Sequence, residues 1–385
     1  MTPGARVAAA IEILNAMADG QPAEQSLTRW GRGNRFAGSK DRAAIRDHVF
    51  AVLRQRRTAA QLGGGETGRA LMIGILRAQG ADLAALFNGV GHAPQPLTDA
   101  EQGIETEADE AIEWNLPDWI IPQFKASLGP RAEAVALALQ ARAPITLRVN
   151  TANITPSAAV VELAEQGIQT RANPLAETAL TVTEGERKIR NSVSYLEGNV
   201  ELQDASSQAV VAAISGTGRI LDYCAGGGGK ALALAVHPAA TVMAHDIDPR
   251  RMQDLPARAD RAGRTIRQIE TDMLANEAPF DVVLCDAPCS GSGAWRRSPE
   301  GKWTLSASRL DELTQIQDNI LDAATALTAK NGVLVYATCS VLACENEDRI
   351  AAFLARNSGW SVGFQKRFDP NDDGDGFFTA HLKRD

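Results

Sequence analysis

The sequence of 385 residues lacks any apolar run approaching the roughly 20 residues that a helix needs to cross a bilayer. Its start shows no charged segment followed by a long apolar stretch, so we expect no secretory signal. Cysteine is scarce, with five in all, and four of them lie at or just beyond the ends of apolar, strand-like runs. We therefore predict no membrane span and no disulfide framework, but free thiols in a reducing compartment, the cytoplasm.

Metal and phosphate signatures are missing as well. The spacings Cys285 to Cys289 and Cys339 to Cys344 have no matching histidine cluster, which argues against a zinc site or another bound metal. The chain has neither the G-x-G-x-x-G spacing of a dinucleotide fold nor the G-x-x-x-x-G-K-[ST] of a P-loop. These absences exclude the commonest glycine-rich nucleotide motifs.

The composition is that of an ordinary globular chain, with 44% hydrophobic and 22% charged residues and a net charge of -8. The length suggests two to three domains. The acidic balance argues against a uniformly basic nucleic-acid coat protein, yet the first sixty residues hold ten Lys or Arg against five Asp or Glu. These cations form either a solvated face or a phosphate-contacting surface, and most cluster around three glycines: Arg29, Arg32, Arg35, Lys40, Arg42 and Arg46.

The pattern of elements divides the chain into three predicted domains. Residues 1–128 are expected to be helical and end in an acidic connector near 99–118, and residues 129–205 to form a small α+β module. From residue 206 onward, strands and helices alternate, which predicts an α/β domain with a doubly wound, largely parallel sheet. The expected strands of that sheet are 219–224, 241–246, 266–270, 281–286 and 333–338, with helices at 249–262 and 307–328.

Polar residues follow these strands where ligands bind in such sheets, outside the carboxyl ends. The run Cys224-Ala225-Gly226-Gly227-Gly228-Gly229-Lys230 opens a helix whose amides can approach a ligand closely. Asp246 ends the next strand, where it or Asp248 can accept hydrogen bonds from ribose hydroxyls. Asp272 ends the third strand, where it could either approach the adenine edge of a nucleoside or cap a helix at the surface. A nucleoside without a pyrophosphate fits best, and S-adenosylmethionine is the candidate cofactor.

Two further expected strands are each followed closely by a cysteine. The fourth ends in Asp286-Ala287-Pro288-Cys289 and the fifth in Thr338-Cys339-Ser340. A buried cysteine is usually structural, but two at neighbouring strand ends beside a nucleoside site favour thiolate chemistry. Cys224 and Cys285 are expected to have packing or backbone roles.

These motifs resemble those of the Nol/Nop/Sun RNA cytosine-5 methyltransferases, most closely the bacterial RsmB type. The similarity extends over nearly the whole chain and includes Asn34 to Arg42, Leu147 to Thr151 and Gln203 to Gln208. It implies a NusB-like all-α RNA-binding domain, an RRM-like module and a Rossmann-like methyltransferase domain. The chain departs from the family at Gly226-Gly227, where the family usually has Ala-Pro, and this departure predicts a looser loop.

The resemblance implies methylation of carbon 5 of a cytosine in RNA, with small-subunit ribosomal RNA as the expected substrate and a monomer as the expected state. It implies Cys339 as nucleophile, Cys289 as the group that helps release the product, and a cofactor site at residues 224–230, Asp246, Asp272 and Asp286. A protonated Asp286 could stabilise the base during attack. Arg296, Arg297 and Lys302 are candidate phosphate contacts or solvent-facing charges.

Three alternatives remain open at this level. The two thiols could have the reverse roles, as in DNA cytosine-5 methyltransferases, which attack from a Pro-Cys motif. The chain could be a non-catalytic RNA-binding or ribosome assembly factor that retains the fold. It could also be a small-molecule methyltransferase, although the basic amino-terminal segment would then be unexplained.

Overall fold

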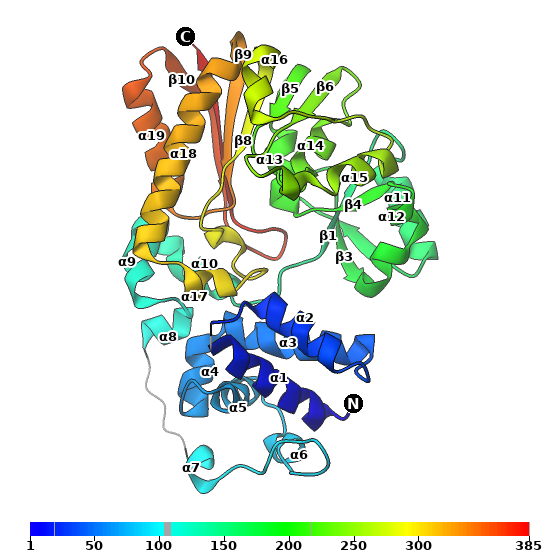
Figure 1. Ribbon diagram of the computed structural model, residues 1–385, viewed down its shortest axis with the longest axis vertical. Helices are drawn as coiled ribbons and strands as arrows, with labels where there is room; N and C mark the ends of the chain where they lie inside the picture. The colour runs from blue at the N-terminus through cyan, green and yellow to red at the C-terminus, as the bar shows by residue number, and fades with distance from the viewer. Residues whose placement is uncertain (19, 104–108, 216, 385) are drawn as a thin grey trace. The chain divides into compact units, whose positions relative to one another are not determined.

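The computed structural model describes residues 1–18, 20–103, 109–215 and 217–384, so part of the predicted acidic connector, including Glu105 and Glu107, lies outside the described residues. The chain divides into two compact units (Figure 1). The helical unit contains Met1–Pro122, Pro130–Ala141 and Trp295–Thr304, and the sheet unit contains Gln123–Gly129, Arg142–Ala294 and Leu305–Asp385. No helix in the described ranges has both the length and the apolar character of a membrane span.

The helical unit is all α, as predicted. The apolar stripe expected at its start lies in α1, where Val7, Ala10 and Leu14 are buried. They pack against apolar residues of α2, α3 and α5 to form one core. The helices of this unit are α1 (Pro3–Ala18), α2 (Ala23–Gly33), α3 (Ser39–Arg54), α4 (Arg56–Gly63), α5 (Gly68–Ala78), α6 (Leu83–Leu86), α7 (Asp99–Gln102), α8 (Glu110–Trp114), η1 (Asp118–Ile120), η2 (Gly129–Arg131), α10 (Ala132–Ala138) and α17 (Glu300–Thr304), while α9 (Ile121–Leu128) runs into the sheet unit.

The segment Trp295–Thr304 belongs to this unit although it is far from it in sequence. It caps two helices there. The Lys302 ammonium donates to the Arg54 carbonyl at 2.7 Å and the Trp303 indole to the Leu53 carbonyl at 2.6 Å, at the carboxyl end of α3. The Glu300 carboxylate accepts the Ala23 amide at 3.1 Å, at the start of α2. A positive charge near the carboxyl end of a helix and a negative charge near its amino end both interact favourably with the helix dipole.

This packing corrects the expected role of two cations. Arg296 is 2% exposed and Lys302 is 1% exposed, so neither side chain is available to a backbone phosphate. The prediction of phosphate contacts is wrong for these two residues. Burial, together with the nearby charge of Arg54, lowers the pKa of Lys302 to about 7.

The small module of the sheet unit is a four-stranded antiparallel sheet in the order β2-β3-β1-β4. This arrangement confirms the predicted RRM-like fold. Its apolar face packs on α11 through residues such as Leu163 and Leu180. The elements are β1 (Thr146–Val149), α11 (Pro156–Glu165), β2 (Gln169–Ala172), β3 (Ala179–Glu184), η3 (Glu186–Asn191), α12 (Val193–Leu196) and β4 (Val200–Leu202).

The large sheet has seven strands in the order β10-β11-β9-β8-β5-β6-β7. Its five strands from β5 to β9 are parallel, and β11 runs antiparallel to its two neighbours. This confirms the predicted Rossmann-like domain, to which the structure adds the hairpin β10–β11. The strands are β5 (Gly218–Asp222), β6 (Ala240–Ala244), β7 (Arg267–Gln268), β8 (Phe280–Asp286), β9 (Thr328–Thr338), β10 (Trp360–Phe368) and β11 (Phe377–Arg384).

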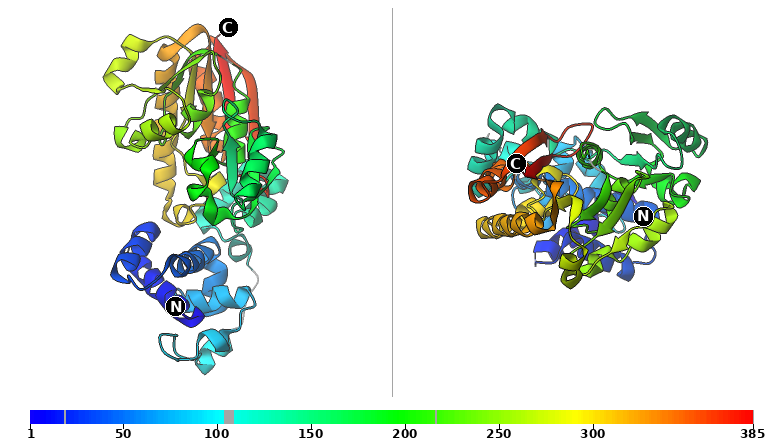
Figure 2. Two further views of the ribbon diagram at one scale, coloured as in Figure 1. Left: turned by 90° about the vertical axis from the view of Figure 1, so that its right-hand side faces the viewer. Right: turned by 90° about the horizontal axis from the view of Figure 1, so that it is seen from above.

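Helices cover both faces of this sheet (Figures 1 and 2). Alternate strand residues face opposite sides, so Ile220 and Val282 pack toward α13, α14 and α15, whereas Leu221 and Val283 pack toward α18 and α19. After β5 the chain adds β6 and β7 on one side of β5, and it then adds β8 and β9 on the other side. This change of direction is the topological switch point of the sheet, and it opens a crevice at the carboxyl ends of the strands. The remaining helices are α13 (Ala205–Ala212), α14 (Gly229–Leu234), η4 (Pro249–Met252), α15 (Leu255–Arg261), η5 (Thr271–Met273), α16 (Leu274–Glu277), η6 (Ser292–Ala294), α18 (Ala307–Leu327), η7 (Ala343–Glu345) and α19 (Glu347–Arg356).

Candidate active site

A cavity of about 610 Å³ lies at the switch point, at the carboxyl ends of β5, β8 and β9. It brings together the glycine run, Asp286, Cys289 and Cys339, which are separate in sequence. A second cavity, of about 670 Å³ beside α13 and α14, has no cysteine, aspartate or glutamate in its lining. The residues that line the first cavity are Gln203, Ser207, Cys224, Ala225, Gly226, Gly227, Gly229, Lys230, Arg251, Asp286, Ala287, Pro288, Cys289, Arg309, Leu313 and Cys339.

The glycine run forms a loop in which one position, Gly228, has room only for glycine. Gly226 and Gly228 have φ values of 51° and 75°, in the left-handed region. A Cβ atom on Gly228 would lie 2.3 Å from Leu255 Cδ1, so this residue must also be small. The Asp246 carboxylate accepts the Gly226 amide at 2.9 Å and thereby ties the loop to the end of β6.

Replacing Gly228 with alanine is expected to weaken binding of the cofactor by roughly tenfold or more, because a left-handed alanine costs about 1–2 kcal/mol before the contact with Leu255 is counted. Gly359 provides the control outside the cavity. Its φ is not in the left-handed region, and an added Cβ would meet nothing within 4 Å. Calorimetry with S-adenosylmethionine should show a clear loss for Gly228→Ala and little change for Gly359→Ala. Equal losses would contradict this account of the loop.

A buried cation lies between two carboxylates next to this loop. The Lys230 ammonium donates to Asp286 Oδ2 at 2.7 Å, and Asp222 lies fully buried nearby. Burial alone would lower the pKa of Lys230, but the two carboxylates outweigh it and the pKa is raised. The proposed role of a protonated Asp286 in stabilising the base during attack remains a prediction from the sequence.

Asp222 is the least well satisfied residue of this group. Among the described residues, neither of its carboxyl oxygens has a hydrogen-bond partner. The nearby Ala231 amide lowers the pKa of Asp222, but other effects outweigh it. Burial, and then the charge of Asp286, raises the pKa of Asp222 to about 7. Below that pH the carboxyl group is therefore largely neutral.

Asp222 is expected to make the stability of the sheet unit depend on pH. Its pKa is higher in the folded than in the unfolded chain, so its contribution is complete below about pH 4 and is lost as the pH rises toward 7. With about 1.4 kcal/mol for each pKa unit, the loss amounts to a few kcal/mol. Thermal unfolding of the Asp222→Asn variant between pH 4.5 and 7.5 should show a flatter profile than the parent protein. Two parallel profiles would rule this origin out.

The two thiols lie side by side at the neighbouring strand ends. Cys289 Sγ and Cys339 Sγ are 3.5 Å apart, and both side chains are partly exposed in the cavity. The hydrogen bond to Cys339 raises the pKa of Cys289 well above its usual value, and burial and the charge of Glu345 add to this effect. This raised pKa favours the protonated thiol of Cys289. Cys285 is fully buried in the core, in keeping with the expected packing role.

The two other predicted acids do not line the cavity. Asp246 is 2% exposed, and its carboxylate is bound by the amides of Gly226 and Asp248 and by the Arg251 guanidinium at 3.0 Å. Asp272 is exposed in η5. Their proposed contacts with the cofactor stay predictions. Within the described residues, no three His, Cys, Asp or Glu side chains gather in a way that could hold a metal ion.

The structure adds residues that the sequence did not single out. Gln203 and Ser207 line the cavity from the start of α13, and Arg148 of β1 donates to Gln203 and to the Gly229 carbonyl, at 2.5 and 2.7 Å. The small sheet thus supports the glycine loop directly. Gln203 and Ser207 lie in the stretch Gln203 to Gln208, whose resemblance to the family could have indicated them from the sequence. No sequence motif indicated Arg251, Arg309 or Leu313 as cavity residues.

Comparison with known proteins gives matches over most of the chain. A family model described as "16S rRNA methyltransferase RsmB/F" matches residues 209–383, and one described as a RsmF/B-like ferredoxin-like domain matches residues 116–187. The chain is 34% identical over 303 residues to ribosomal RNA small subunit methyltransferase B of Xanthomonas campestris, which covers 73% of this chain and 68% of that protein.

Solved structures show the same fold. The crystal structure of a protein named PH0851 superposes with a TM-score of 0.80 at 22% identity, over 100% of this chain and 99% of that chain. The structure of NSun6 from Pyrococcus horikoshii with SFG gives a TM-score of 0.60 at 17% identity, over 70% of this chain and 98% of that one.

Proposed function

Because this chain belongs to the RsmB/F family of 16S rRNA methyltransferases, we propose that it transfers a methyl group from S-adenosylmethionine to carbon 5 of a cytosine in small-subunit ribosomal RNA. The observation that carries the proposal is the pair of thiols, Cys289 and Cys339, 3.5 Å apart in the cavity that also contains the glycine loop. Two thiols at neighbouring strand ends suit a reaction that forms and then breaks a covalent bond to the base.

The residues of the cavity fit S-adenosylmethionine, which supplies an electrophilic methyl group when bound. The left-handed glycines give backbone amides close access to a ligand, and α14 begins at the loop. Asp246 would accept hydrogen bonds from the ribose hydroxyls once Arg251 leaves its carboxylate. Asp272 would contact the adenine, and Lys230 and Asp286 would lie beside the methyl donor.

Cys339 is the proposed nucleophile. Its thiolate attacks carbon 6 of the cytosine, so a sulfur–carbon bond forms and the electron pair of the ring's 5,6 double bond makes carbon 5 nucleophilic. Carbon 5 can then accept the methyl group. The two sulfur atoms are 3.5 Å apart and either can act as the donor, so the choice of Cys339 over Cys289 follows the resemblance of the Thr338-Cys339-Ser340 motif to that of the family.

Cys289 is also the proposed participant in release. After methylation, carbon 5 carries both a methyl group and a proton, and the proton must leave before the ring can recover its double bond. Once Cys339 is bonded to carbon 6 it no longer accepts the hydrogen bond of Cys289, and Cys289 releases its own thiol proton to solvent. The Cys289 thiolate then accepts the carbon 5 proton directly or through a water molecule. The electron pair of that carbon–hydrogen bond restores the 5,6 double bond, the bond between carbon 6 and Cys339 breaks, and the Cys339 thiolate is regenerated.

The basic segment of the helical unit is the proposed RNA-binding surface. Arg29, Arg32, Arg35 and Lys40 are exposed in and around the loop between α2 and α3, in keeping with phosphate contacts. Arg46 is bound to Glu24, so it contributes less charge to this surface. The target cytosine must lie in an accessible loop or be flipped from its stack to reach the thiols.

We further propose that the chain acts as a monomer in the cytoplasm, where its substrate is made. Its five cysteines are free, which suits a reducing compartment. Light scattering of the purified protein would test the monomer.

Bisulfite sequencing of 16S ribosomal RNA tests the proposed function. Cells that carry the protein should contain a cytosine that resists conversion, and cells without it should not. Complementation with Cys339→Ala should fail to restore the resistance, because that variant lacks the nucleophile. Identical conversion patterns in all three strains would contradict the proposal. Failure to bind S-adenosylmethionine in calorimetry would favour the non-catalytic assembly factor instead.

A further inference from the structure

Glu345 is a fully buried carboxylate beneath the two thiols, at the end of η7. It accepts the Ser290 amide at 2.7 Å, the Gln317 side-chain amide at 3.2 Å and the Ser340 hydroxyl at 2.5 Å, and it also accepts the Ser290 hydroxyl. All four groups are hydrogen-bond donors, so the two carboxylate oxygens of Glu345 serve as their common acceptor.

The positions of these donors connect Glu345 to both reactive residues. Ser290 directly follows Cys289, and Ser340 directly follows Cys339. One carboxylate therefore joins the loop after β8 to the loop after β9, next to the 3.5 Å contact between the sulfur atoms. The Ser292 and Ser340 hydroxyls, 2.9 Å apart, form a second link between the same loops.

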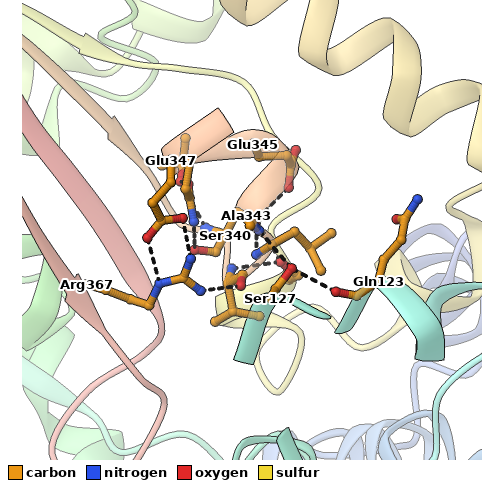
Figure 3. Close-up of polar contacts among 12 residues, drawn as sticks. Gln123, Ser127, Ser340, Ala343, Glu345, Glu347 and Arg367 are labelled. Carbon is orange, nitrogen blue, oxygen red and sulfur yellow. Dashed lines mark hydrogen bonds and ion pairs between the residues drawn. The ribbon is translucent and has the colours of Figure 1, made fainter. Parts of the chain in front are cut away.

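The loop that carries Glu345 is itself held in place from outside the cavity. Figure 3 shows Ser127, Arg367 and Glu347 around it. The Ala343 amide donates to the Ser127 hydroxyl at 2.9 Å, and Arg367 pairs with Glu347 while donating to the Val341 carbonyl at 2.6 Å. These contacts fix the loop, so Glu345 has little freedom to follow either thiol if that thiol moves.

The charge of Glu345 acts on the Cys289 thiol. It raises the pKa of Cys289, after the larger effects of the Cys339 hydrogen bond and burial. It therefore favours the protonated state of Cys289, the state that can donate to a Cys339 thiolate. Other titratable groups near Cys289 include Cys339 and Tyr336. The cavity that Cys289 lines also has these titratable or charged residues: Cys224, Lys230, Arg251, Asp286 and Arg309.

We propose that Glu345 is a positioning residue that sets the separation of Cys289 and Cys339 and keeps Cys289 protonated until the base is attacked. This role rests on the proposed cytosine methylation for its purpose, but the thiol geometry and protonation can be measured without RNA or cofactor. Failure of the proposed function and failure of this role are therefore distinguishable.

The test is the pH dependence of alkylation of each cysteine by iodoacetamide in the full chain, followed by mass spectrometry. In Glu345→Gln, which keeps the volume and removes the charge, Cys289 should react at lower pH than in the parent protein. Glu347→Gln is the matched control, because it removes a carboxylate charge two residues after Glu345. The hydrogen bonds of the Glu347 carboxylate in the described structure go to Arg367 and not to Ser290 or Ser340, and Arg367 can keep its bond to the Val341 carbonyl in this variant. It should leave the Cys289 profile unchanged.

Turnover gives a second readout. Glu345→Gln should lower kcat by about tenfold, as expected for thiols that are slightly misplaced, while KM for S-adenosylmethionine stays unchanged because Glu345 does not line the cavity. An unchanged Cys289 profile in folded Glu345→Gln, or an equal shift in Glu347→Gln, would overturn the proposal. If Glu345→Gln does not fold, Ser340→Ala removes one donor and no charge. Slower turnover at unchanged cofactor KM would then support the role, and unchanged turnover would overturn it.

Discussion

The Cys339→Ala variant is expected to form no covalent adduct with RNA and to lose methyl transfer by a factor on the order of a thousand or more, because it lacks the group that makes carbon 5 reactive. Binding of S-adenosylmethionine should survive, since the glycine loop and the Lys230–Asp286 pair remain in place. Gel electrophoresis under denaturing conditions detects the adduct, and transfer of labelled methyl groups measures the reaction.

The Cys289→Ala variant should behave in the opposite way. It retains the Cys339 nucleophile but lacks the group proposed to help remove the carbon 5 proton, so the adduct should form and persist. Cys344→Ala is the control, because Cys344 lies five residues after Cys339 and does not line the cavity. It should behave like the parent protein. A persistent adduct in Cys339→Ala and none in Cys289→Ala would reverse the two roles.

Replacing Lys230 with methionine is expected to cause the next largest loss. Lys230 is the buried cation between Asp222 and Asp286, and its removal leaves those carboxyl groups without their positive neighbour. Removing one partner of a buried ion pair typically costs about 3–5 kcal/mol. Affinity for S-adenosylmethionine should fall by about a hundredfold or more, measured by calorimetry, and the midpoint of thermal unfolding should fall with it.

The double variant Lys230→Met, Asp286→Asn separates the two effects. It removes the charge that Lys230 neutralises, so much of the thermal stability should return. Cofactor affinity should not return, because both groups border the cavity. Recovery of both quantities would mean that the pair is purely structural.

Much of the sheet and of the cavity could be predicted because the necessary signals are local. The buried parallel strands β5, β6, β8 and β9 each end in a recognisable change from apolar to polar residues, and parallel strands align their carboxyl ends. This alignment is enough to predict that Cys289 and Cys339 lie near each other. The hairpin was missed, because β10 is mostly exposed and has no clear alternation.

What could not be predicted depends on partners far away in the sequence. Arg296 and Lys302 resemble solvent-facing cations, and only the position of Arg54, 248 residues before Lys302, shows that one is a buried helix cap. Glu345 resembles any surface acid beside a helix. Its role becomes visible only when the loops carrying Ser290 and Ser340 are brought together by the order of β8 and β9.

The capping of α2 and α3 by the segment Trp295–Thr304 has a consequence for how such proteins can diversify. A gene fragment that ends before this segment encodes a helical unit whose Leu53 and Arg54 carbonyls lose their donors and whose Ala23 amide loses its acceptor. Recombination that exchanges only the amino-terminal part between relatives would leave α2 and α3 of one protein capped by the 295–304 segment of another. The helical unit and the ten residues from 295 to 304 should therefore be inherited as a pair, and a hybrid should regain stability when the matching segment is exchanged with it.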